Sequence, residues 1–360
     1  MNGVCVIAQF PPPIHGLSKA VETLYDSSLK EKYHFTRINI TNNKHIVGCV
    51  FTLLFSKCDV FYLTLSQTKG GNWRDLLFLK LIAWKKKKCI VHLHGGYYRT
   101  LIDKDCGNFQ RNCNRRAIQQ LDACIVLGNS LISVFDGLIN RNKIHVVPNC
   151  VDNQYMPFAV QEKANMLLVQ SQLHILYLSN FIASKGYREV LELALKVKEE
   201  GKTEAFHFHF AGKFFEEEEE SYFFSFIQKY HLEGSITYHS IVSGKKKNDL
   251  LHLCHIFILL TRYPNEGQPI SILEAMGNGM SIVTTNHAGI PDIVNAENGL
   301  ICSKNSIQID SLFLYLLDCY QHRDLLRNIC FKNHALAQSL YTESQYIHNM
   351  DNVFDEVCHA

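Results

Sequence analysis

Short runs of apolar residues recur along the chain, and between them apolar residues return every three or four positions. The short runs predict buried strands, and the three-to-four spacing predicts amphipathic helices. The predicted strands are residues 3–8, 60–65, 89–93, 121–128, 174–178, 206–211, 235–239, 255–262 and 281–285. Strands that alternate with helices in this way form parallel sheets, so the pattern predicts an α/β protein.

Composition then limits the class of protein. The chain has 360 residues, of which 47% are hydrophobic, and a net charge of +2. This length allows two domains with separate cores, and the near-neutral balance argues against nucleic acid as the main partner. No run reaches the eighteen apolar residues of a membrane helix; the nearest is Ile46–Phe55. The first residues lack a basic leader, so we expect a cytoplasmic protein.

Cysteine and histidine are abundant but show no ligand spacing. None of the 13 cysteines forms a CxxC pair, and several lie inside apolar runs. This favours reduced cysteines in the core over a disulfide frame or a zinc site. Among the 18 histidines, His207 and His209 alternate within one predicted strand. We interpret them as ordinary core or surface residues.

The most informative stretch is residues 261–291, where Glu266 and Glu274 flank a Gly-Gln-Pro turn. Pro269 suits the first turn of a helix, and Ile270 begins the apolar face of that helix. The backbone N–H groups of Gly267, Gln268 and Ile270 would then point at a ligand near the helix N-terminus. The pattern indicates a site for a polyhydroxylated, anionic molecule.

This stretch resembles the donor-binding signature of glycosyltransferase family 4, whose members are retaining enzymes. The resemblance implies the GT-B fold, with two Rossmann-like domains whose parallel sheets face a central cleft. We expect an acceptor-side domain over residues 1–163 and a nucleotide-sugar domain over residues 164–340. Residues 153–172 would form the linker, and residues 341–360 a helix that crosses back to the first domain.

The resemblance also assigns roles to the signature and to the loop after residue 178. Glu274 would accept the ribose hydroxyls, Glu266 would orient the donor sugar, and Lys185 would hold the diphosphate. Where the family has a Gly-Arg pair, this chain has Ser179 and Asn180. A second cation is therefore missing or comes from another residue, for which the candidates are Arg188, Lys213 and Arg262.

Further loops match the family position by position. Gly16 takes the place of a glycine that faces the cleft, although His15 replaces the usual second glycine. His94, which borders a glycine pair at a strand end, would lie beside the donor sugar. Gly212 follows another strand, and Val242 lies in the loop near the nucleobase. Independently of the family, Ser18 is a candidate N-cap for the first helix.

Three charge runs have simpler interpretations. Glu216–Glu220 suit the first turn of a helix better than a metal cluster, and Lys245–Lys247 suit a solvated helix start. Lys85–Lys88 suit the end of a helix. Because Trp73 and Trp84 lie nearby, contact with anionic lipid is the alternative for this last run.

Together these features predict a hexosyltransferase-type enzyme that moves a sugar from a nucleoside-diphosphate sugar to a glycan or lipid-linked acceptor. Family precedent suggests bacterial surface polysaccharide biosynthesis, such as O-antigen, lipopolysaccharide or capsule, with no metal or other cofactor. Peripheral contact with the cytoplasmic face of the inner membrane is compatible with this function. The alternatives are a non-catalytic nucleotide-sugar-binding subunit and a GT-B-fold sugar-nucleotide epimerase.

Overall fold

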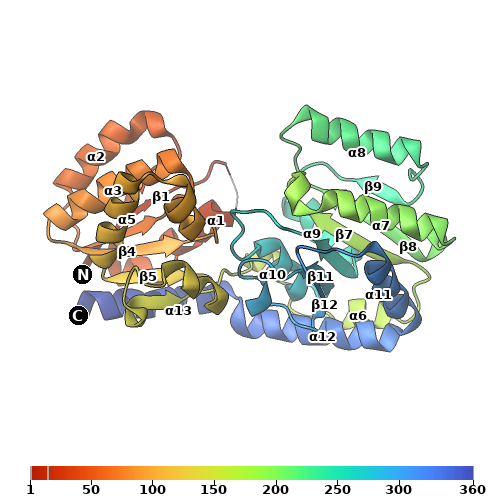
Figure 1. The fold of residues 1–360 in the computed structure, drawn as a ribbon. Coiled ribbons are helices and arrows are strands. Elements are labelled where there is room, and N and C mark those ends of the chain that lie inside the picture. Colours follow the sequence, from red (N-terminus) through yellow and green to blue (C-terminus); the bar gives the residue numbers. More distant parts are fainter. Residues whose placement is uncertain (1, 14–15, 360) are drawn as a thin grey trace. The chain divides into compact units, whose positions relative to one another are not determined.

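The computed structural model describes residues 2–13 and 16–359 (Figure 1). His15, whose role the sequence left open, lies outside them. The chain divides into two compact units. Unit 1 comprises Met1–Cys150, Pro264–Gln268 and Glu343–Ala360, and unit 2 comprises Val151–Tyr263 and Pro269–Thr342.

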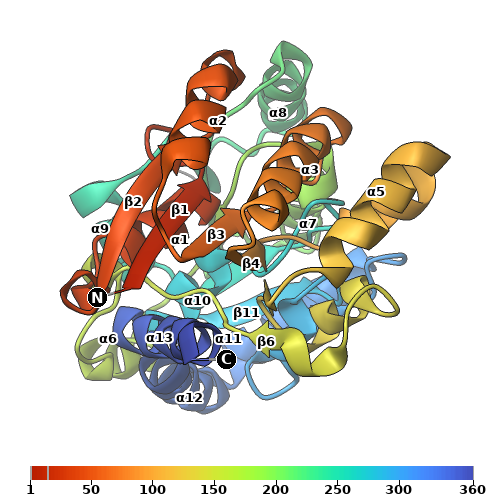
Figure 2. The same ribbon diagram turned by 90° about the vertical axis from the view of Figure 1, so that its left-hand side faces the viewer.

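Unit 1 is built on a six-stranded parallel sheet with the order β2-β1-β3-β4-β5-β6. Its strands are β1 (Asn2–Ala8), β2 (Tyr33–Asn39), β3 (Val60–Thr64), β4 (Lys88–Leu93), β5 (Ala123–Val126) and β6 (Ile144–Val146). Its helices are α1 (Gly16–Tyr25), α2 (Ile46–Phe55), α3 (Lys69–Trp84), α4 (Tyr98–Thr100), α5 (Asn108–Gln119) and α13 (Glu343–His359). Figure 2 shows α2, α3 and α5 in a row.

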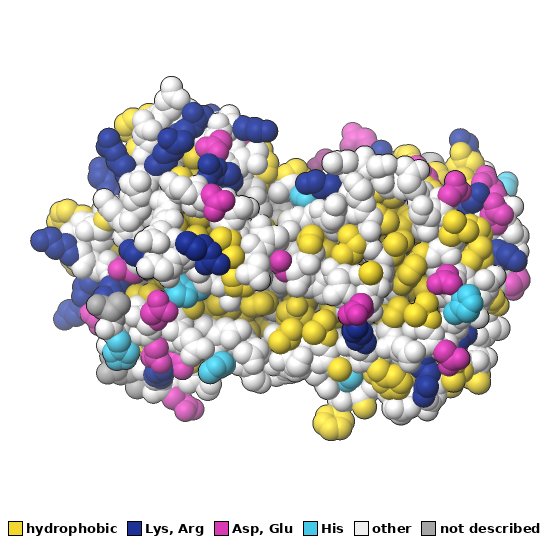
Figure 3. All heavy atoms as spheres, turned by 60° about the horizontal axis from the view of Figure 1, so that its bottom comes forward, with side chains coloured by type: hydrophobic (Ala, Val, Ile, Leu, Met, Phe, Trp, Pro, Cys, Tyr) yellow, Lys and Arg dark blue, Asp and Glu magenta, His cyan; other side chains and the backbone are white. Residues whose placement is uncertain are grey.

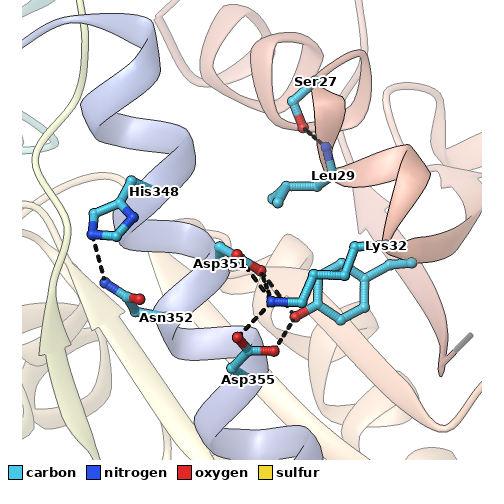
Figure 4. Close-up of polar contacts among 8 residues, drawn as sticks. Ser27, Leu29, Lys32, His348, Asp351, Asn352 and Asp355 are labelled. Carbon is cyan, nitrogen blue, oxygen red and sulfur yellow. Dashed lines mark hydrogen bonds and ion pairs between the residues drawn. The ribbon is translucent and has the colours of Figure 1, made fainter.

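The other face of this sheet is covered by α1 and α13, which come from opposite ends of the chain. Val21 and Leu24 of α1 share one buried cluster with Tyr346 and Phe354 of α13. Polar contacts fix the outer side of α13: the Lys32 ammonium lies 2.8 Å from Asp351 and 2.5 Å from Asp355 (Figure 4). The Tyr33 hydroxyl also donates to both carboxylates.

Unit 2 repeats the architecture with the strand order β12-β11-β10-β7-β8-β9, again all parallel. Its strands are β7 (Leu173–Leu178), β8 (Phe206–Ala211), β9 (Ile236–Tyr238), β10 (Ile256–Leu259), β11 (Ser281–Thr285) and β12 (Gly299–Cys302). Its helices are α6 (Gln161–Met166), α7 (Tyr187–Glu199), α8 (Glu217–Lys229), α9 (Gly244–Leu253), α10 (Ile270–Gly277), α11 (Ile309–Gln321) and α12 (Arg323–Leu340). The expectation of two Rossmann-like parallel-sheet domains is confirmed.

Two local predictions are wrong. Residues 153–172 are not a linker, since they contain α6, and Val160, Ala164 and Leu167 are buried in the core of unit 2. Ser18 is not an N-cap, because α1 begins two residues earlier and the buried Ser18 hydroxyl donates to the carbonyl of Pro13 at 2.9 Å. In both places, polar residues of the sequence belong to a helical segment that packs within its unit.

Four histidines of unit 2 form a connected row. His174 Nδ1 lies 2.9 Å from His209 Nε2, and His209 Nδ1 lies 2.8 Å from His239 Nε2. His255 Nδ1 accepts from the backbone N–H of His174 at 3.0 Å. Burial, and then the neighbouring histidines, lower the pKa of His209 to about 3. These rings therefore pair with each other in the neutral form.

The described part of the chain shows neither a metal cluster nor a membrane helix. Across residues 2–13 and 16–359, no three His, Cys, Asp or Glu side chains are grouped as metal ligands. No helix there has the length and hydropathy needed to cross a bilayer. Among the described residues no cysteine forms a disulfide, and most cysteines are buried.

Candidate functional site

In unit 1, the carboxyl end of β4 meets the first part of the signature stretch. The backbone N–H of Gly96 donates to the carbonyl of Glu266 at 2.6 Å. Gly267 lies so close to β4 that an added Cβ would stand 2.3 Å from the carbonyl oxygen of His94. The chain thereby brings His94 together with Glu266 and Gly267, which are far from it in sequence.

Gln268 fixes this loop from its other side. Its side-chain carbonyl accepts from the backbone N–H of Asn149 at 2.7 Å, and its amide donates to the carbonyl of Leu127 at 3.1 Å. The Asn149 amide donates in turn to the Gln268 backbone carbonyl at 2.9 Å. The side chain of Gln268 therefore positions the loop, and only its backbone is available for a ligand.

His92 and His94 stack with ring centroids 3.9 Å apart. His92 is fully buried, and its Nδ1 lies 2.7 Å from the Tyr62 hydroxyl. Burial, and then His94, hold the pKa of His92 well below its usual range. The neutral His92 supports the ring of His94, which is itself partly exposed.

The backbone amides of the signature turn remain open to a ligand. Gly267 and Gln268 are buried in unit 1, and Ile270 begins α10 in unit 2. Among the described residues, nothing accepts a hydrogen bond from their N–H groups. Buried N–H groups without an acceptor are rare in folded proteins, so the positions of Gly267 and Gln268 suit an anionic or hydroxyl ligand. The N–H of Ile270 is one of the groups at a helix N-terminus that have no intrahelical acceptor, and such groups favour anions.

In unit 2, three loops meet at the carboxyl edge of the sheet. Gly212 follows β8 with φ +153°, and an added Cβ would stand 1.9 Å from the carbonyl oxygen of Ser179, which follows β7. Gly186 has φ +83°, and its Cβ would stand 2.4 Å from the carbonyl oxygen of Leu260, which follows β10. Glycine permits both close approaches. The carboxyl edge is also where open parallel sheets bind ligands.

Lys185 and Lys213 carry positive charge at this edge. The Lys185 ammonium lies 4.8 Å from the centre of the Tyr263 ring, and the Lys213 ammonium lies 5.1 Å from that of Phe215. Asn180 is exposed, and its backbone carbonyl accepts from the hydroxyl of Tyr177 at 2.9 Å. Lys213 is joined to the same loop, because its carbonyl accepts from the N–H of Phe181.

The other two candidates for the missing cation are engaged elsewhere. Arg188 forms an ion pair with Glu219 at 2.9 Å and covers the ring of Tyr222. Arg262 forms an ion pair with Glu189. Of the three candidates, Lys213 is the one for which the described residues contain no carboxylate partner.

Glu274 is buried in α10 and forms an ion pair with Lys247. Burial raises the pKa of Glu274, and the Lys247 ammonium opposes that rise. Lys247 also lies 4.1 Å from the centre of the Tyr155 ring. The interpretation of Lys247 as part of a solvated helix start is therefore wrong: its side chain is only 17% exposed.

Lys247 and Tyr155 were not identified as site residues from the sequence. The sequence indicates only that α9 starts near Gly244. This helix start gives no information about Glu274, which pairs with Lys247 from 27 positions away. Val242 packs half-buried against the core of unit 2, and Gly16 is the exposed first residue of α1 in unit 1.

Residues 161–329 match the family model described as glycosyl transferases group 1. This segment, slightly less than half of the chain, is similar to the glycosyl transferases of that family. N-acetyl-alpha-D-glucosaminyl L-malate synthase from Bacillus anthracis is 24% identical to the chain over 229 residues. That alignment covers 62% of this chain and 56% of the relative, so it spans little more than half of the relative's length.

Solved structures with low sequence identity show the same fold as this chain. Anabaena HepE in complex with UDP-glucose has a TM-score of 0.74 at 12% identity, over 99% of this chain and all of that one. Sucrose-phosphate synthase from Thermosynechococcus elongatus has a TM-score of 0.75 at 11% identity, over the whole of both chains. The GT-B fold expected from the sequence is confirmed.

Proposed function

We propose that the chain transfers a sugar from a nucleoside-diphosphate sugar to a hydroxyl group of a glycan or lipid-linked acceptor, with retention of anomeric configuration. The observation that carries the proposal is the buried Glu274 of the signature helix α10, which forms an ion pair with Lys247 of α9. A buried carboxylate with a single cationic partner keeps lone pairs free, and these suit the two hydroxyls of a ribose.

The reaction breaks the bond between the anomeric carbon and the diphosphate oxygen and forms one to the acceptor oxygen. The acceptor proton passes to the departing phosphate on the same face of the sugar. Negative charge grows on the diphosphate, so fixed cations and amides stabilise the transition state. We assign this role to Lys185, to Lys213 as the second cation, and to the backbone amides of Gly267 and Ile270. No metal is required by this assignment.

Glu266 and His94 act on the donor sugar in this proposal. They are joined within unit 1 through the Gly96–Glu266 hydrogen bond and the close approach of Gly267 to His94. The carboxylate of Glu266 would accept sugar hydroxyls, and His94 would lie against the ring. Neither residue is assigned as a nucleophile.

Relatives suggest which donors to test first. Anabaena HepE is described in complex with UDP and with UDP-glucose, and the Bacillus anthracis relative is named for an N-acetylglucosaminyl product. We therefore propose a UDP-sugar as donor and a role in bacterial surface polysaccharide assembly. A lipid-linked acceptor would bring the protein to the cytoplasmic face of the membrane.

A second candidate is a nucleotide-sugar-binding subunit without catalytic activity. The observation in its favour is Asn180, which supplies no charge where the family resemblance implies an arginine, while Arg188 and Arg262 are held by carboxylates. Such a subunit would bind the donor through Glu274 but would not cleave it.

Release of nucleoside diphosphate by the purified chain tests the proposal. UDP-, GDP- and ADP-sugars are compared, with thermal shift recorded on the same samples and a membrane-lipid extract supplied as acceptor. Release from one donor supports the enzyme and identifies the sugar. Stabilisation by a donor without release, even with lipid present, favours the non-catalytic subunit. An epimerised sugar in the absence of acceptor would indicate the epimerase instead.

A further inference from the structure

Unit 1 exposes large apolar side chains on three adjacent helices, which we term the aromatic–basic face. Its apolar members are Val47, Phe51 and Phe55 of α2, Trp73, Leu77 and Trp84 of α3, and Phe109 of α5. Phe55 and Trp84 are 78% and 73% exposed. Isolated exposed apolar residues are ordinary, but aromatic residues gathered on one set of helices indicate an interaction surface.

Members of the face are related within and between the helices. Val47, Phe51 and Phe55 recur every four positions, so they lie along one side of α2. Trp73 of α3 stacks on Phe109 of α5, with ring centroids 6.1 Å apart and planes inclined by 28°. Helix α3 contacts both α2 and α5, so the three helices that carry these residues lie side by side, as the row in Figure 2 shows.

Basic side chains surround the apolar members. Residues 43–88 contain nine Lys and Arg but only two Asp and Glu, a net charge of +7 in a chain whose total is +2. Within the part of the chain that the structure describes, no carboxylate pairs with the exposed lysines at positions 44, 57, 69, 80 and 86. Helix α5 adds Arg111, Arg115 and Arg116 without an acidic residue. Figure 3 shows dark-blue side chains gathered on the part of the view that contains unit 1.

We propose that the aromatic–basic face binds the surface of a membrane rich in anionic lipid. Tryptophan and phenylalanine insert at the level of lipid headgroups, and lysines beside them pair with lipid phosphates. Nucleic acid explains the lysines but not the aliphatic and aromatic side of α2. In a dimer formed through this face, two positively charged surfaces would meet and repel each other.

The inference rests on the part of the proposed function that places the acceptor in a membrane, but it can be tested without turnover. The full chain is sedimented with vesicles of phosphatidylethanolamine and phosphatidylglycerol, and separately with phosphatidylcholine vesicles. We expect binding to the anionic vesicles, weakened by high salt, and much less binding to the neutral ones. Donor hydrolysis is measured on the same samples, so that loss of catalysis and loss of lipid binding are scored separately.

Two variants test the apolar and the charged residues of the face separately. Phe51→Ser/Phe55→Ser/Trp84→Ser removes the apolar contact, and Lys57→Gln/Lys80→Gln/Lys86→Gln removes three charges. The charge variant should bind anionic vesicles roughly a hundredfold more weakly, given the contribution of each lysine near such a surface. The matched control, Phe158→Ser/Leu314→Ser, changes exposed apolar residues of unit 2 and should bind like the wild type. Circular dichroism verifies that each variant is folded.

Several outcomes would overturn the proposal. Absence of vesicle binding, or equal binding to neutral vesicles at all salt concentrations, would remove the anionic membrane as the partner. A dimer in analytical ultracentrifugation that the aromatic variant converts to a monomer would assign the face to a second copy. Binding of a short RNA without binding of vesicles would assign it to nucleic acid.

Discussion

The Lys247 ammonium lies 2.6 Å from the carboxylate of Glu274, and both side chains are largely shielded from solvent within unit 2. An isolated buried carboxylate would take up a proton, because burial penalises its charged form. Lys247 therefore keeps Glu274 ionised where a carboxylate can accept hydroxyl groups. The pair links a helix start to the signature helix, and the proposed nucleotide site depends on it.

Substitution of Lys247 by methionine should weaken nucleotide binding. Without the ammonium, the pKa of the buried Glu274 rises further above its usual value, which favours the protonated carboxyl group. We expect an affinity loss of roughly ten- to a hundredfold at pH 7, the scale of a lost hydrogen bond to a charged group. Titration calorimetry with UDP from pH 6 to pH 9 should show part of the loss recovered as the pH rises, because a higher pH favours the ionised carboxylate. The control Lys245→Met removes an exposed lysine that pairs with Asp249; a loss independent of pH would contradict this role.

Lys185→Ala should lower turnover more than donor binding. Its ammonium is assigned to the leaving diphosphate, and removal of one such group typically costs about a hundred- to a thousandfold in rate. Single-turnover release of nucleoside diphosphate measures the rate, and calorimetry measures the affinity. Lys213→Ala should show a smaller effect of the same kind, whereas the exposed Lys202→Ala should show none. Wild-type turnover in Lys185→Ala would remove the leaving-group assignment.

Gly267→Ala should disturb the loop at the end of β4. The new methyl group would stand 2.3 Å from the His94 carbonyl oxygen, so loop and strand must separate. We expect a loss of stability of about 1–3 kcal/mol and a larger loss of activity, since Glu266 moves with the loop. Gly234→Ala is the control, because nothing lies within 4 Å of its added Cβ. Equal melting temperatures and equal turnover for both variants would argue against the close contact.

In the wild type, the free energy of unfolding should rise as the pH increases from about 8 to 10.5, and Lys163→Met should remove that rise. Lys163 is buried and donates to the carbonyls of Leu251 and Asn278 at 2.9 and 2.8 Å. Burial lowers its pKa to about 8, below the usual 10.5 of the unfolded chain. Between these two values the unfolded chain binds more protons, so stability rises with pH, by about 3 kcal/mol in total. Urea unfolding at pH 7 to 10.5 should show that rise in the wild type and in the exposed control Lys202→Met, but not in Lys163→Met.

His209→Gln should reduce the loss of stability in mild acid. The folded pKa of His209 is about 3 and its usual value is 6.5, so the unfolded chain takes up a proton first as the pH falls. The contribution of neutral His209 to the free energy of unfolding is therefore fully present above pH 6.5. It declines as the pH falls toward 3, by up to about 1.4 kcal/mol per pH unit. Between pH 7 and pH 5 the variant should lose about 2 kcal/mol less than the wild type. His252→Gln, on an exposed position of α9, serves as control; parallel pH curves for wild type and His209→Gln would count against the neutral row.

The strands and most helices could be predicted because their signals are local. The apolar runs that became β8 and β11 match the predicted bounds, and Glu274 lies on the helix that the Gly-Gln-Pro turn indicated. Residues 153–172 could not be predicted as well, because α6 is short and polar and becomes helical through the packing of Val160 and Ala164.

The sequence by itself determined the order of strands and helices, the Glu266–Glu274 signature and the resemblance to a glycosyltransferase family, because spacing and turn chemistry are properties of neighbouring residues. Only the tertiary structure decided which distant residues meet. Lys247 pairs with Glu274, Gln268 binds Asn149, and His174, His209 and His239 form one row, because the strand order places their elements side by side. Such contacts depend on burial and sheet order, for which the linear pattern carries no signal.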